Sequence, residues 1–256
     1  MTEIHVRPGT QLHGSSGARI VYDDSWGIAT KTGDSRVGEQ GAWLQLHRSP
    51  IVPDVYLVRP DGYDMQRLTE LPKSTTNPDL LTCEIVLQLD AHIWSVPPSV
   101  NISMELHTEK VDALAREWLT GKSVLRLLKV RERVEWDSLR KCLTHGDPTY
   151  DNVMVHPNGR IILIDPIPAT SAVPDLMAVD IGKIMQSLKG YEEMRYAPYL
   201  VVDAGELDTL HYLVSEIEWE AAEYWCIVHF LRAVPYMPAH VKKLLIGAVD
   251  DILRML

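Results

Sequence analysis

The pattern of apolar and polar residues divides the chain into a strand-rich first part and a helix-rich second part. In the first part, short stretches rich in β-branched and aromatic residues predict strands. These stretches are residues 20–22, 26–31, 52–58 and 63–68. Turn-forming residues, Asp23-Asp24-Ser25 and Asp61-Gly62, join them in pairs, which predicts two hairpins. A helix is expected between the two hairpins, at residues 35–47.

Beyond residue 78 apolar residues recur every three to four positions, as in Leu81, Ile85 and Leu89, which is typical of helices with one buried face. The helices expected here are residues 79–94, 104–119, 124–143, 175–188, 206–231 and 239–256. A polar segment with two prolines, residues 72–78, precedes them and is interpreted as a linker. The pattern therefore predicts an α+β protein with a β-rich domain at 1–72 and an α-rich domain at 73–256.

One hairpin is predicted inside the helical part. Residues 153–155 and 161–164 are apolar, Asp165 ends the second run, and Pro157-Asn158-Gly159 lies between the two runs as a turn. This hairpin follows the stretch that carries the most distinctive chemistry, His145-Gly146-Asp147.

Composition and charge narrow the function classes. The formal net charge of −10 argues against binding to nucleic acid or to anionic membranes. The three cysteines form no CxxC pair, so neither a disulfide framework nor a zinc site is expected. We see no signal peptide and no apolar run long enough to span a membrane. We therefore expect a cytoplasmic protein, and the sequence leaves its oligomeric state open.

The candidate catalytic residues are His145, Asp147, Asn152 and Asp165. Asp147 precedes Asn152 by five residues and Asp165 follows Asn152 by thirteen, which is the spacing of a kinase catalytic loop leading to a metal-binding aspartate. In this interpretation Asp147 orients the acceptor hydroxyl and accepts its proton, and His145 braces the loop. Asn152 and Asp165 supply the hard oxygen ligands that Mg²⁺ prefers. The alternative, that Asp147 and Asn152 only form turns, does not explain all four residues together.

These residues resemble the signature of the aminoglycoside phosphotransferase and choline kinase family, in which H-G-D replaces the H-R-D of protein kinases and an I-D strand end replaces D-F-G. The segment 179–191 is similar to a motif of phosphotransferases found with capsule or surface-sugar genes. The resemblance implies a bilobal protein-kinase-like fold, with a small antiparallel sheet and one helix in the N-lobe and a larger, mainly helical C-lobe.

The resemblance also implies a strand lysine that binds the α- and β-phosphates and pairs with a helical glutamate. Lys31 and Glu39 are the candidates, although only eight residues separate them. Arg36 and Lys73 are weaker alternatives for contacting phosphate.

Further nucleotide contacts are implied at two segments. Ser15 and Ser16, between two glycines, are candidates for a flexible cover over the phosphates, and an ordinary surface turn is the alternative. Met65, Arg67 and Leu68 lie in the segment whose backbone groups would bind the nucleotide base.

Two features near the C-terminus invite a functional interpretation. Residues 206–223 are acidic, which would suit a cationic acceptor, but a solvated helix face is favoured. Trp219, Tyr224 and Trp225 could line a substrate pocket, but aromatic residues at helical spacing are more often core.

The predicted function is phosphotransfer from ATP or GTP to a hydroxyl of a small molecule, assisted by Mg²⁺. The acceptor stays open among a sugar, an aminoglycoside and an amino-alcohol such as choline. One alternative keeps the fold and uses a protein as acceptor. The other is a pseudokinase that binds a nucleotide or ligand without turnover.

Overall fold

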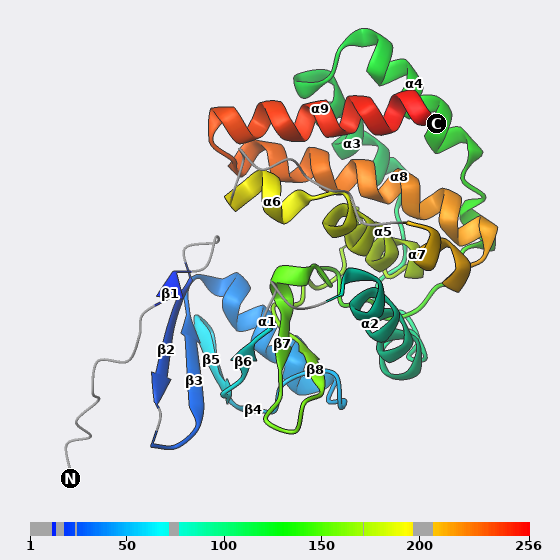
Figure 1. Cartoon of the computed structure of the whole chain (residues 1–256). Helices are drawn as coiled ribbons and strands as arrows, with labels where there is room; N and C mark the ends of the chain where they lie inside the picture. Colours follow the sequence, from blue (N-terminus) through cyan, green and yellow to red (C-terminus); the bar gives the residue numbers. More distant parts are fainter. Residues whose placement is uncertain (1–11, 14–17, 24, 72–76, 171, 197–206) are drawn as a thin grey trace. The chain divides into compact units, whose positions relative to one another are not determined.

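The computed structural model describes residues 12–13, 18–23, 25–71, 77–170, 172–196 and 207–256. The chain divides into two compact units, each described by itself below. The first comprises residues 1–73 and 152–168, and the second comprises residues 74–151 and 169–256. Figure 1 labels the helices and strands of both.

The first unit contains two antiparallel sheets. The five-stranded sheet has the order β1-β2-β3-β5-β4 and the three-stranded sheet has the order β6-β7-β8. The strands of the larger sheet are β1 (Leu12–His13), β2 (Arg19–Asp23), β3 (Ile28–Thr32), β4 (Val55–Arg59) and β5 (Gly62–Gln66). Those of the smaller sheet are β6 (Thr69–Glu70), β7 (Val153–Val155) and β8 (Ile161–Leu163). The predicted hairpins β2–β3, β4–β5 and β7–β8 are all present.

The helix α1 (Ser35–Leu46) accompanies these sheets. Asp34 caps its first turn by accepting a hydrogen bond from the Arg36 amide. Gly38 and Gly41 let the helix lie directly on β4 and β5. A Cβ atom at Gly38 would come within 2.3 Å of the Pro60 carbonyl oxygen, and one at Gly41 within 2.7 Å of Tyr63. The helix is therefore fixed close to the strand that carries Tyr63.

The hairpin β7–β8 joins the first unit, whereas the sequence analysis placed it in the C-terminal domain. Two sets of hydrogen bonds explain the difference. Strand β6 pairs with β7, and the Leu163 amide donates to the Ile51 carbonyl at 2.7 Å. An apolar cluster of Leu68, Ile162 and Ile164 packs between these strands.

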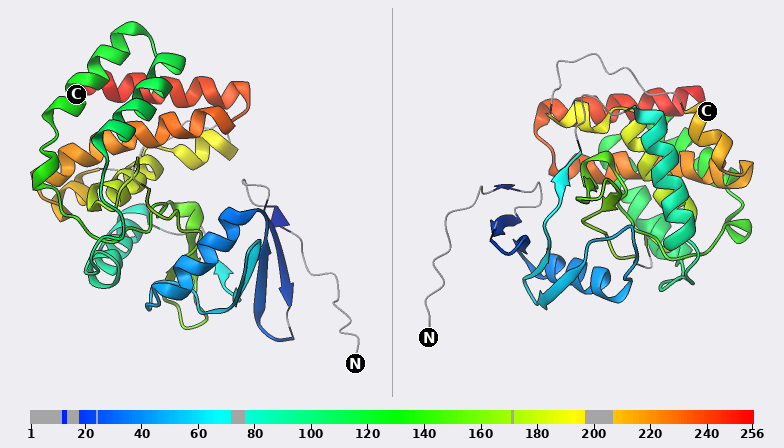
Figure 2. Two further views of the ribbon diagram at one scale, coloured as in Figure 1. Left: turned by 180° about the vertical axis from the view of Figure 1, so that it is seen from behind. Right: turned by 60° about the horizontal axis from the view of Figure 1, so that its bottom comes forward.

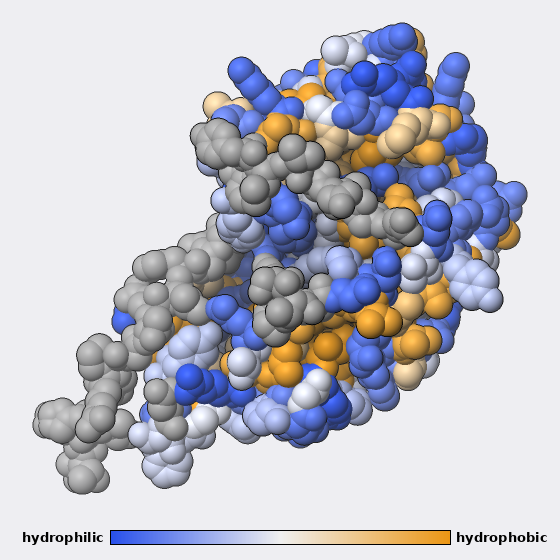
Figure 3. Space-filling view, viewed as in Figure 1, coloured by the Kyte–Doolittle hydropathy of each residue, from blue (hydrophilic) through white to orange (hydrophobic). Residues whose placement is uncertain are grey.

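The second unit is helical, as predicted. Its helices are α2 (Pro78–His92), α3 (Met104–Trp118), α4 (Gly121–Arg133), α5 (Met177–Leu188), α6 (Tyr191–Tyr196), α7 (Asp208–Leu213), α8 (Glu216–Ala233) and α9 (Ala239–Met255). Two 3₁₀ turns, η2 (Trp136–Ser138) and η4 (Val234–Tyr236), lie between them, and a third, η3 (Tyr150–Asn152), spans the point where the chain passes to the first unit. Hydrophilic residues alternate with apolar ones over the face of α4 and α9 in Figure 3.

Two predicted helices are wrong in extent. The helix expected at 124–143 is α4, which begins at Gly121 and ends at Arg133. The 3₁₀ turn η2 and a non-helical segment follow, in which the Leu143 amide donates to the Val96 carbonyl at 2.8 Å. The helix expected at 206–231 is interrupted at Val214, and Ser215 caps the new helix α8 through the Glu218 amide.

The core of the second unit forms where α5 packs on α8, which run side by side in both views of Figure 2. Gly182 permits the close approach, because a Cβ atom there would meet the Trp225 side chain at 2.7 Å. Trp219, Tyr224 and Trp225 are all buried in this region. The core interpretation of these aromatic residues is therefore confirmed. No helix among the described residues combines the length and apolar character needed to cross a membrane.

Candidate functional site

Lys31 contacts residues from two other segments of the first unit. Its side chain is buried on β3, opposite Tyr63 of β5. The Lys31 ammonium is 2.6 Å from Oδ1 of Asp165 and donates to Oε1 of Gln40 at 3.0 Å. The strand and the end of the β7–β8 hairpin thus bring together two of the predicted residues.

The predicted partner Glu39 requires a correction. Gln40 is the residue of α1 that contacts Lys31, and Glu39 is exposed. The reason is the direction of the helix faces: Gly38 and Gly41 lie on the sheet, so Gln40 flanks this face and Glu39 points to solvent. Arg36 is exposed and pairs with Asp34, while Lys73 lies outside the described residues.

Asp165 has an unusual backbone. Its φ of 58° is the sole positive value among the described non-glycine residues. Such a conformation costs about 1–3 kcal/mol and persists where the surrounding structure imposes it, which is characteristic of functional sites. The Tyr63 hydroxyl lies 3.4 Å from Oδ1 of Asp165. Burial, together with the Asp165 charge, raises the pKa of Tyr63 well above its ordinary value, so this hydroxyl stays protonated and donates.

Asn152 and Asp165 are neighbours within the same unit. The Asn152 carbonyl accepts a hydrogen bond of 2.9 Å from the amide of Ile164, the residue before Asp165. One amide and one carboxylate oxygen fit Mg²⁺, which usually takes one or two protein carboxylates and completes its shell with phosphates and water. No cluster of three or more His, Cys, Asp or Glu side chains that could hold a metal is found in the described part of the chain.

The segment predicted to bind the nucleotide base runs from β5 to β6. Met65 and Leu68 are buried. The Arg67 amide is already occupied by the Gly27 carbonyl at 2.8 Å, whereas no hydrogen bond to the main chain of Leu68 is found among the described residues. The main-chain groups of Leu68 are therefore available for a base. Ser15 and Ser16 lie outside the described residues.

In the second unit, the loop His145-Gly146-Asp147 is anchored by one carboxylate. Asp180 of α5 accepts hydrogen bonds from the His145 amide at 2.9 Å and from the Gly146 amide at 2.7 Å. Gly146 has φ of 78°, a region that favours glycine. This conformation aims both amides at Asp180, which explains why the central residue of the triplet is glycine. His145 is fully buried.

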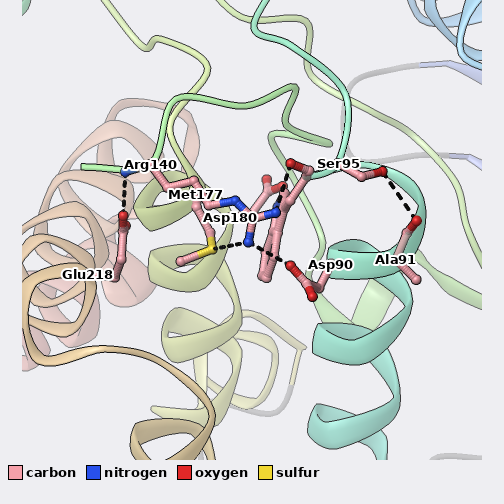
Figure 4. Close-up of polar contacts among 8 residues, drawn as sticks. Asp90, Ala91, Ser95, Arg140, Met177, Asp180 and Glu218 are labelled. Atoms are coloured by element: carbon pink, nitrogen blue, oxygen red, sulfur yellow. Dashed lines mark hydrogen bonds and ion pairs between the residues drawn. The ribbon is translucent and has the colours of Figure 1, made fainter. Parts of the chain in front are cut away.

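The Asp180 carboxylate is itself held by a residue from a neighbouring element. Trp94, just beyond α2, donates its indole N–H to Asp180 at 2.9 Å. Burial raises the pKa of Asp180 to about 7, although its three hydrogen bonds act in the opposite direction. Figure 4 shows that Arg140 contributes to the same region, donating its guanidinium to Asp90 and its amide to Glu218. The buried Glu218 is therefore a structural residue of the acidic stretch that was predicted to be a solvated face.

A second carboxylate, Asp175, fixes the residues that precede the loop. Its Oδ1 accepts hydrogen bonds from the amide and hydroxyl of Thr144, and its Oδ2 accepts from Ser99. Asp175 is buried, like Asp180. Two buried carboxylates that follow the loop in the sequence thus hold the consecutive residues Thr144, His145 and Gly146.

Asp147 pairs with a cation that the sequence analysis did not assign. Its Oδ1 lies 2.9 Å from Nζ of Lys183 on α5, and the two side chains are 21 % and 13 % exposed. Lys183 belongs to the segment 179–191 that carried part of the family resemblance. The three-residue spacing between Asp180 and Lys183 was a usable signal, because residues three or four apart share a helix face. Asp147 and His145 belong to the second unit, whereas Asn152 and Asp165 belong to the first.

Comparison with solved structures identifies the fold. The choline kinase LicA from Streptococcus pneumoniae matches with a TM-score of 0.63 and 12 % identity, over 96 % of this chain and 92 % of that one. A ternary complex of streptomycin, ATP and APH(2'')-IIa matches with a TM-score of 0.57 and 12 % identity, over 98 % and 93 %. The GDP complex of aminoglycoside 2'-phosphotransferase-IIIa matches with a TM-score of 0.59 and 11 % identity, over 99 % and 94 %. No protein-family model and no curated protein sequence matches the chain.

Proposed function

We propose that this chain, which has the fold of choline kinases and aminoglycoside phosphotransferases, transfers a phosphoryl group from ATP or GTP to a hydroxyl of a small molecule. The observation that carries the proposal is the contact of 2.6 Å between the buried Lys31 and the partly buried Asp165, with Asp165 held at a positive φ. A buried lysine and a carboxylate on a strained backbone are both costly, and phosphate binding gives both residues a use. The structures solved with ATP and GDP support nucleotide binding by this fold.

Four of the predicted residues would carry the reaction. Lys31 would bind the α- and β-phosphates, and Asn152 and Asp165 would hold Mg²⁺, which would neutralise charge on the phosphate oxygens. The acceptor oxygen forms a bond to the γ-phosphorus while the bond from that phosphorus to the β–γ bridging oxygen breaks. Asp147 receives the proton of the acceptor hydroxyl, and the nucleoside diphosphate leaves.

The nucleotide base would be bound by the main chain of Leu68, because its amide and carbonyl make no hydrogen bond among the described residues. Ser15 and Ser16 stay candidates for covering the phosphates. A cytoplasmic location and an acceptor from surface-sugar metabolism also stay predictions.

A transfer screen tests the proposal. Purified protein is incubated with Mg²⁺, ATP or GTP and a panel of hydroxylated metabolites, and phosphorylated products are measured by mass spectrometry. The Asp147→Asn variant serves as the blank, because it keeps the size of the side chain and removes its basicity. Transfer by the wild type and none by the variant supports the proposal, and equal transfer by both contradicts the role of Asp147.

The same samples separate the enzyme from a pseudokinase. Calorimetry measures the affinity for nucleotide with and without Mg²⁺. Tight binding without transfer to any acceptor and without slow hydrolysis would establish a binding protein instead. Phosphorylation of a protein substrate in place of small molecules would favour the protein-kinase alternative.

A further inference from the structure

Two residues of α5 hold the loop His145-Gly146-Asp147 from one side of the helix. Asp180 accepts hydrogen bonds from the His145 amide at 2.9 Å and from the Gly146 amide at 2.7 Å. Three residues further along the helix, Nζ of Lys183 lies 2.9 Å from Oδ1 of Asp147. Residues three apart share a helix face. Asp180 therefore fixes the backbone of the loop, and Lys183 contacts the side chain at its end.

The Lys183 ammonium has a second acceptor, which is neutral. It donates to Oε1 of Gln186 at 3.2 Å, and Gln186 is fully buried. An amide oxygen fixes the direction of the ammonium without neutralising its charge, so the charge stays directed at Asp147. Lys31 has the same combination of one carboxylate and one glutamine. Two of the candidate carboxylates of this chain are thus each paired with a lysine that a glutamine orients.

The contact between Lys183 and Asp147 is shielded from solvent. The two side chains are 13 % and 21 % exposed, and Oδ1 of Asp147 is itself buried. Opposite charges interact more strongly away from water, and losing one partner leaves the other charge partly buried and uncompensated. Since Oδ1 is buried, the exposure of the Asp147 side chain comes from its other atoms. Lys183 therefore contacts the carboxylate oxygen that faces the interior of the second unit.

The packing of α5 on α8 gives Lys183 a rigid base. At its neighbour Gly182, a Cβ atom would meet the Cys226 amide nitrogen at 2.9 Å. One turn before Lys183, the ring Nε2 of His229 donates to the Val179 carbonyl at 3.0 Å. Groups that orient a reacting side chain hold it most precisely when they are carried by such a packed helix. The position of the Lys183 backbone is therefore set before any ligand binds.

We propose that Lys183 is the positioning residue of Asp147, which binds Oδ1 and thereby directs Oδ2 towards the acceptor hydroxyl. This inference rests on the proposed phosphotransferase function and assigns a further residue to the same reaction. A carboxylate held only by its backbone can rotate about its side-chain bonds. A contact to one of its oxygens fixes that rotation, and small misplacements of a reacting group cost large factors in rate.

The step keeps every proton accounted for. The proton of the acceptor hydroxyl moves to Oδ2 of Asp147 as the acceptor oxygen bonds to the γ-phosphorus and the bond to the β–γ bridging oxygen breaks. Lys183 retains its own proton and touches neither the acceptor nor the phosphates. Its contribution is therefore expected in kcat, with little effect on the binding of nucleotide.

Steady-state kinetics of Lys183→Gln tests this inference. ADP release from Mg-ATP is measured with water alone as acceptor and with each metabolite of the transfer screen, which includes choline, glucose and streptomycin. We expect kcat to fall about tenfold to a hundredfold, the range for losing a hydrogen bond to a charged group, and the KM for ATP to stay nearly unchanged. Lys183→Arg keeps the positive charge and is expected to recover part of the loss.

Matched variants separate positioning from folding. Lys189→Gln makes the same substitution at the end of α5, at a similarly half-buried lysine, and should retain the wild-type kcat. Lys183→Met keeps the apolar stem of the lysine and is the second test if Lys183→Gln folds poorly. A wild-type kcat in folded Lys183→Met overturns the inference. So does a loss of kcat that only follows the loss of folded protein, measured by circular dichroism.

A double-mutant cycle with Asp147→Asn decides whether Lys183 acts through Asp147. In that background Lys183→Gln is expected to cause little further loss, because the group it positions is already gone. An equal fold-loss in both backgrounds means that Lys183 acts independently of Asp147. A raised KM for ATP with an unchanged kcat means that Lys183 contacts the donor phosphates. Either result overturns the inference.

The outcomes also separate this inference from the proposed function. Transfer by the wild type together with full activity of the Lys183 variants leaves the phosphotransferase function standing and removes the role of Lys183. An absence of ADP release with water and with every acceptor, in the wild type and in the variants alike, contradicts the proposed function and the inference with it.

Discussion

Gln40 accepts a hydrogen bond of 3.0 Å from Lys31, at the place where the family resemblance implied a glutamate. Lys31 thus has one charged partner, Asp165, and one neutral partner. A neutral amide orients the ammonium without competing with Asp165 or with phosphate for its charge. Mutation of Gln40 is therefore expected to impair nucleotide use, whereas mutation of its neighbour Glu39 is not.

Gln40→Ala is expected to lower kcat/KM for the nucleotide about tenfold, because a hydrogen bond to a charged group contributes about 1.5–3 kcal/mol. Glu39→Ala is the control and should leave the kinetics unchanged, since Glu39 is exposed. Steady-state kinetics with varied ATP or GTP measures both. A larger loss in Glu39→Ala than in Gln40→Ala would restore the partner predicted from the sequence.

Asp165 can be tested separately as a ligand and as a backbone position. Asp165→Asn and Asp165→Ala both remove the charge, so both are expected to weaken binding of the Mg-nucleotide, measured by calorimetry. Asparagine tolerates a positive φ better than alanine does. Asp165→Ala should therefore lower the free energy of unfolding by about 1 kcal/mol more than Asp165→Asn. Unchanged nucleotide affinity in both variants would exclude Asp165 from the site.

The close contact between α1 and β5 implies that a larger residue at Gly41 destabilises the protein. Gly41→Ala places a methyl group 2.7 Å from the Tyr63 side chain, which is fully buried. Overpacking of this kind costs about 1–3 kcal/mol, and chemical denaturation measures it. Gly247→Ala in α9 is the control, because nothing lies within 4 Å of a Cβ atom there. A stable Gly41→Ala variant would mean that the helix can shift away from the strand.

The buried Glu192 is expected to make the free energy of unfolding depend on pH. Burial raises the pKa of Glu192 from 4.5 to about 7, and its Oε1 accepts a hydrogen bond of 2.7 Å from the Ser187 hydroxyl. Because the folded-state pKa lies above the unfolded one, protonated Glu192 favours the folded state. This contribution is complete below pH 4.5 and is lost as the pH rises through about 7. Its size is roughly 3 kcal/mol at most.

The matched variant is Glu192→Gln, which resembles the protonated side chain. We expect it to flatten the decline in unfolding free energy between pH 5 and 7 and to be more stable than the wild type at pH 8, by denaturation at each pH. Asp180, whose pKa burial raises to about 7, contributes in the same direction and is unchanged in this variant. Parallel curves for both proteins would show that Glu192 does not titrate in this range.

The sequence predicted much of the fold because its signals are local. Alternating strands, the Asp61-Gly62 turn and the capped helix after Asp34 each depend on a few neighbouring residues. The predicted kinase-like fold is confirmed by the solved structures of the same fold. The helix expected at 206–231 was too long because the Ser215 cap was overlooked within an otherwise continuous pattern.

The site was predictable only where its residues form a short motif. His145, Asp147, Asn152 and Asp165 have a recognisable spacing, whereas partners from other elements have none. Gln40 was missed because the choice between two adjacent helix residues depends on how closely α1 approaches the sheet. Lys183 was missed as a partner of Asp147 because their contact joins residues far apart in sequence. The catalytic roles themselves stay predictions.

The hydrogen bonds from the His145 and Gly146 amides to Asp180 restrict the motion of the loop that carries Asp147. Loops that bind ligands usually open at a small fraction of the free energy of global unfolding. Here the carboxylate belongs to α5, which packs on α8 in the core. These two amide hydrogens can exchange with deuterium from solvent only when α5 releases them. A loop bearing the candidate base would then be among the slowest-exchanging segments of the chain, and its geometry would be set before any substrate arrives.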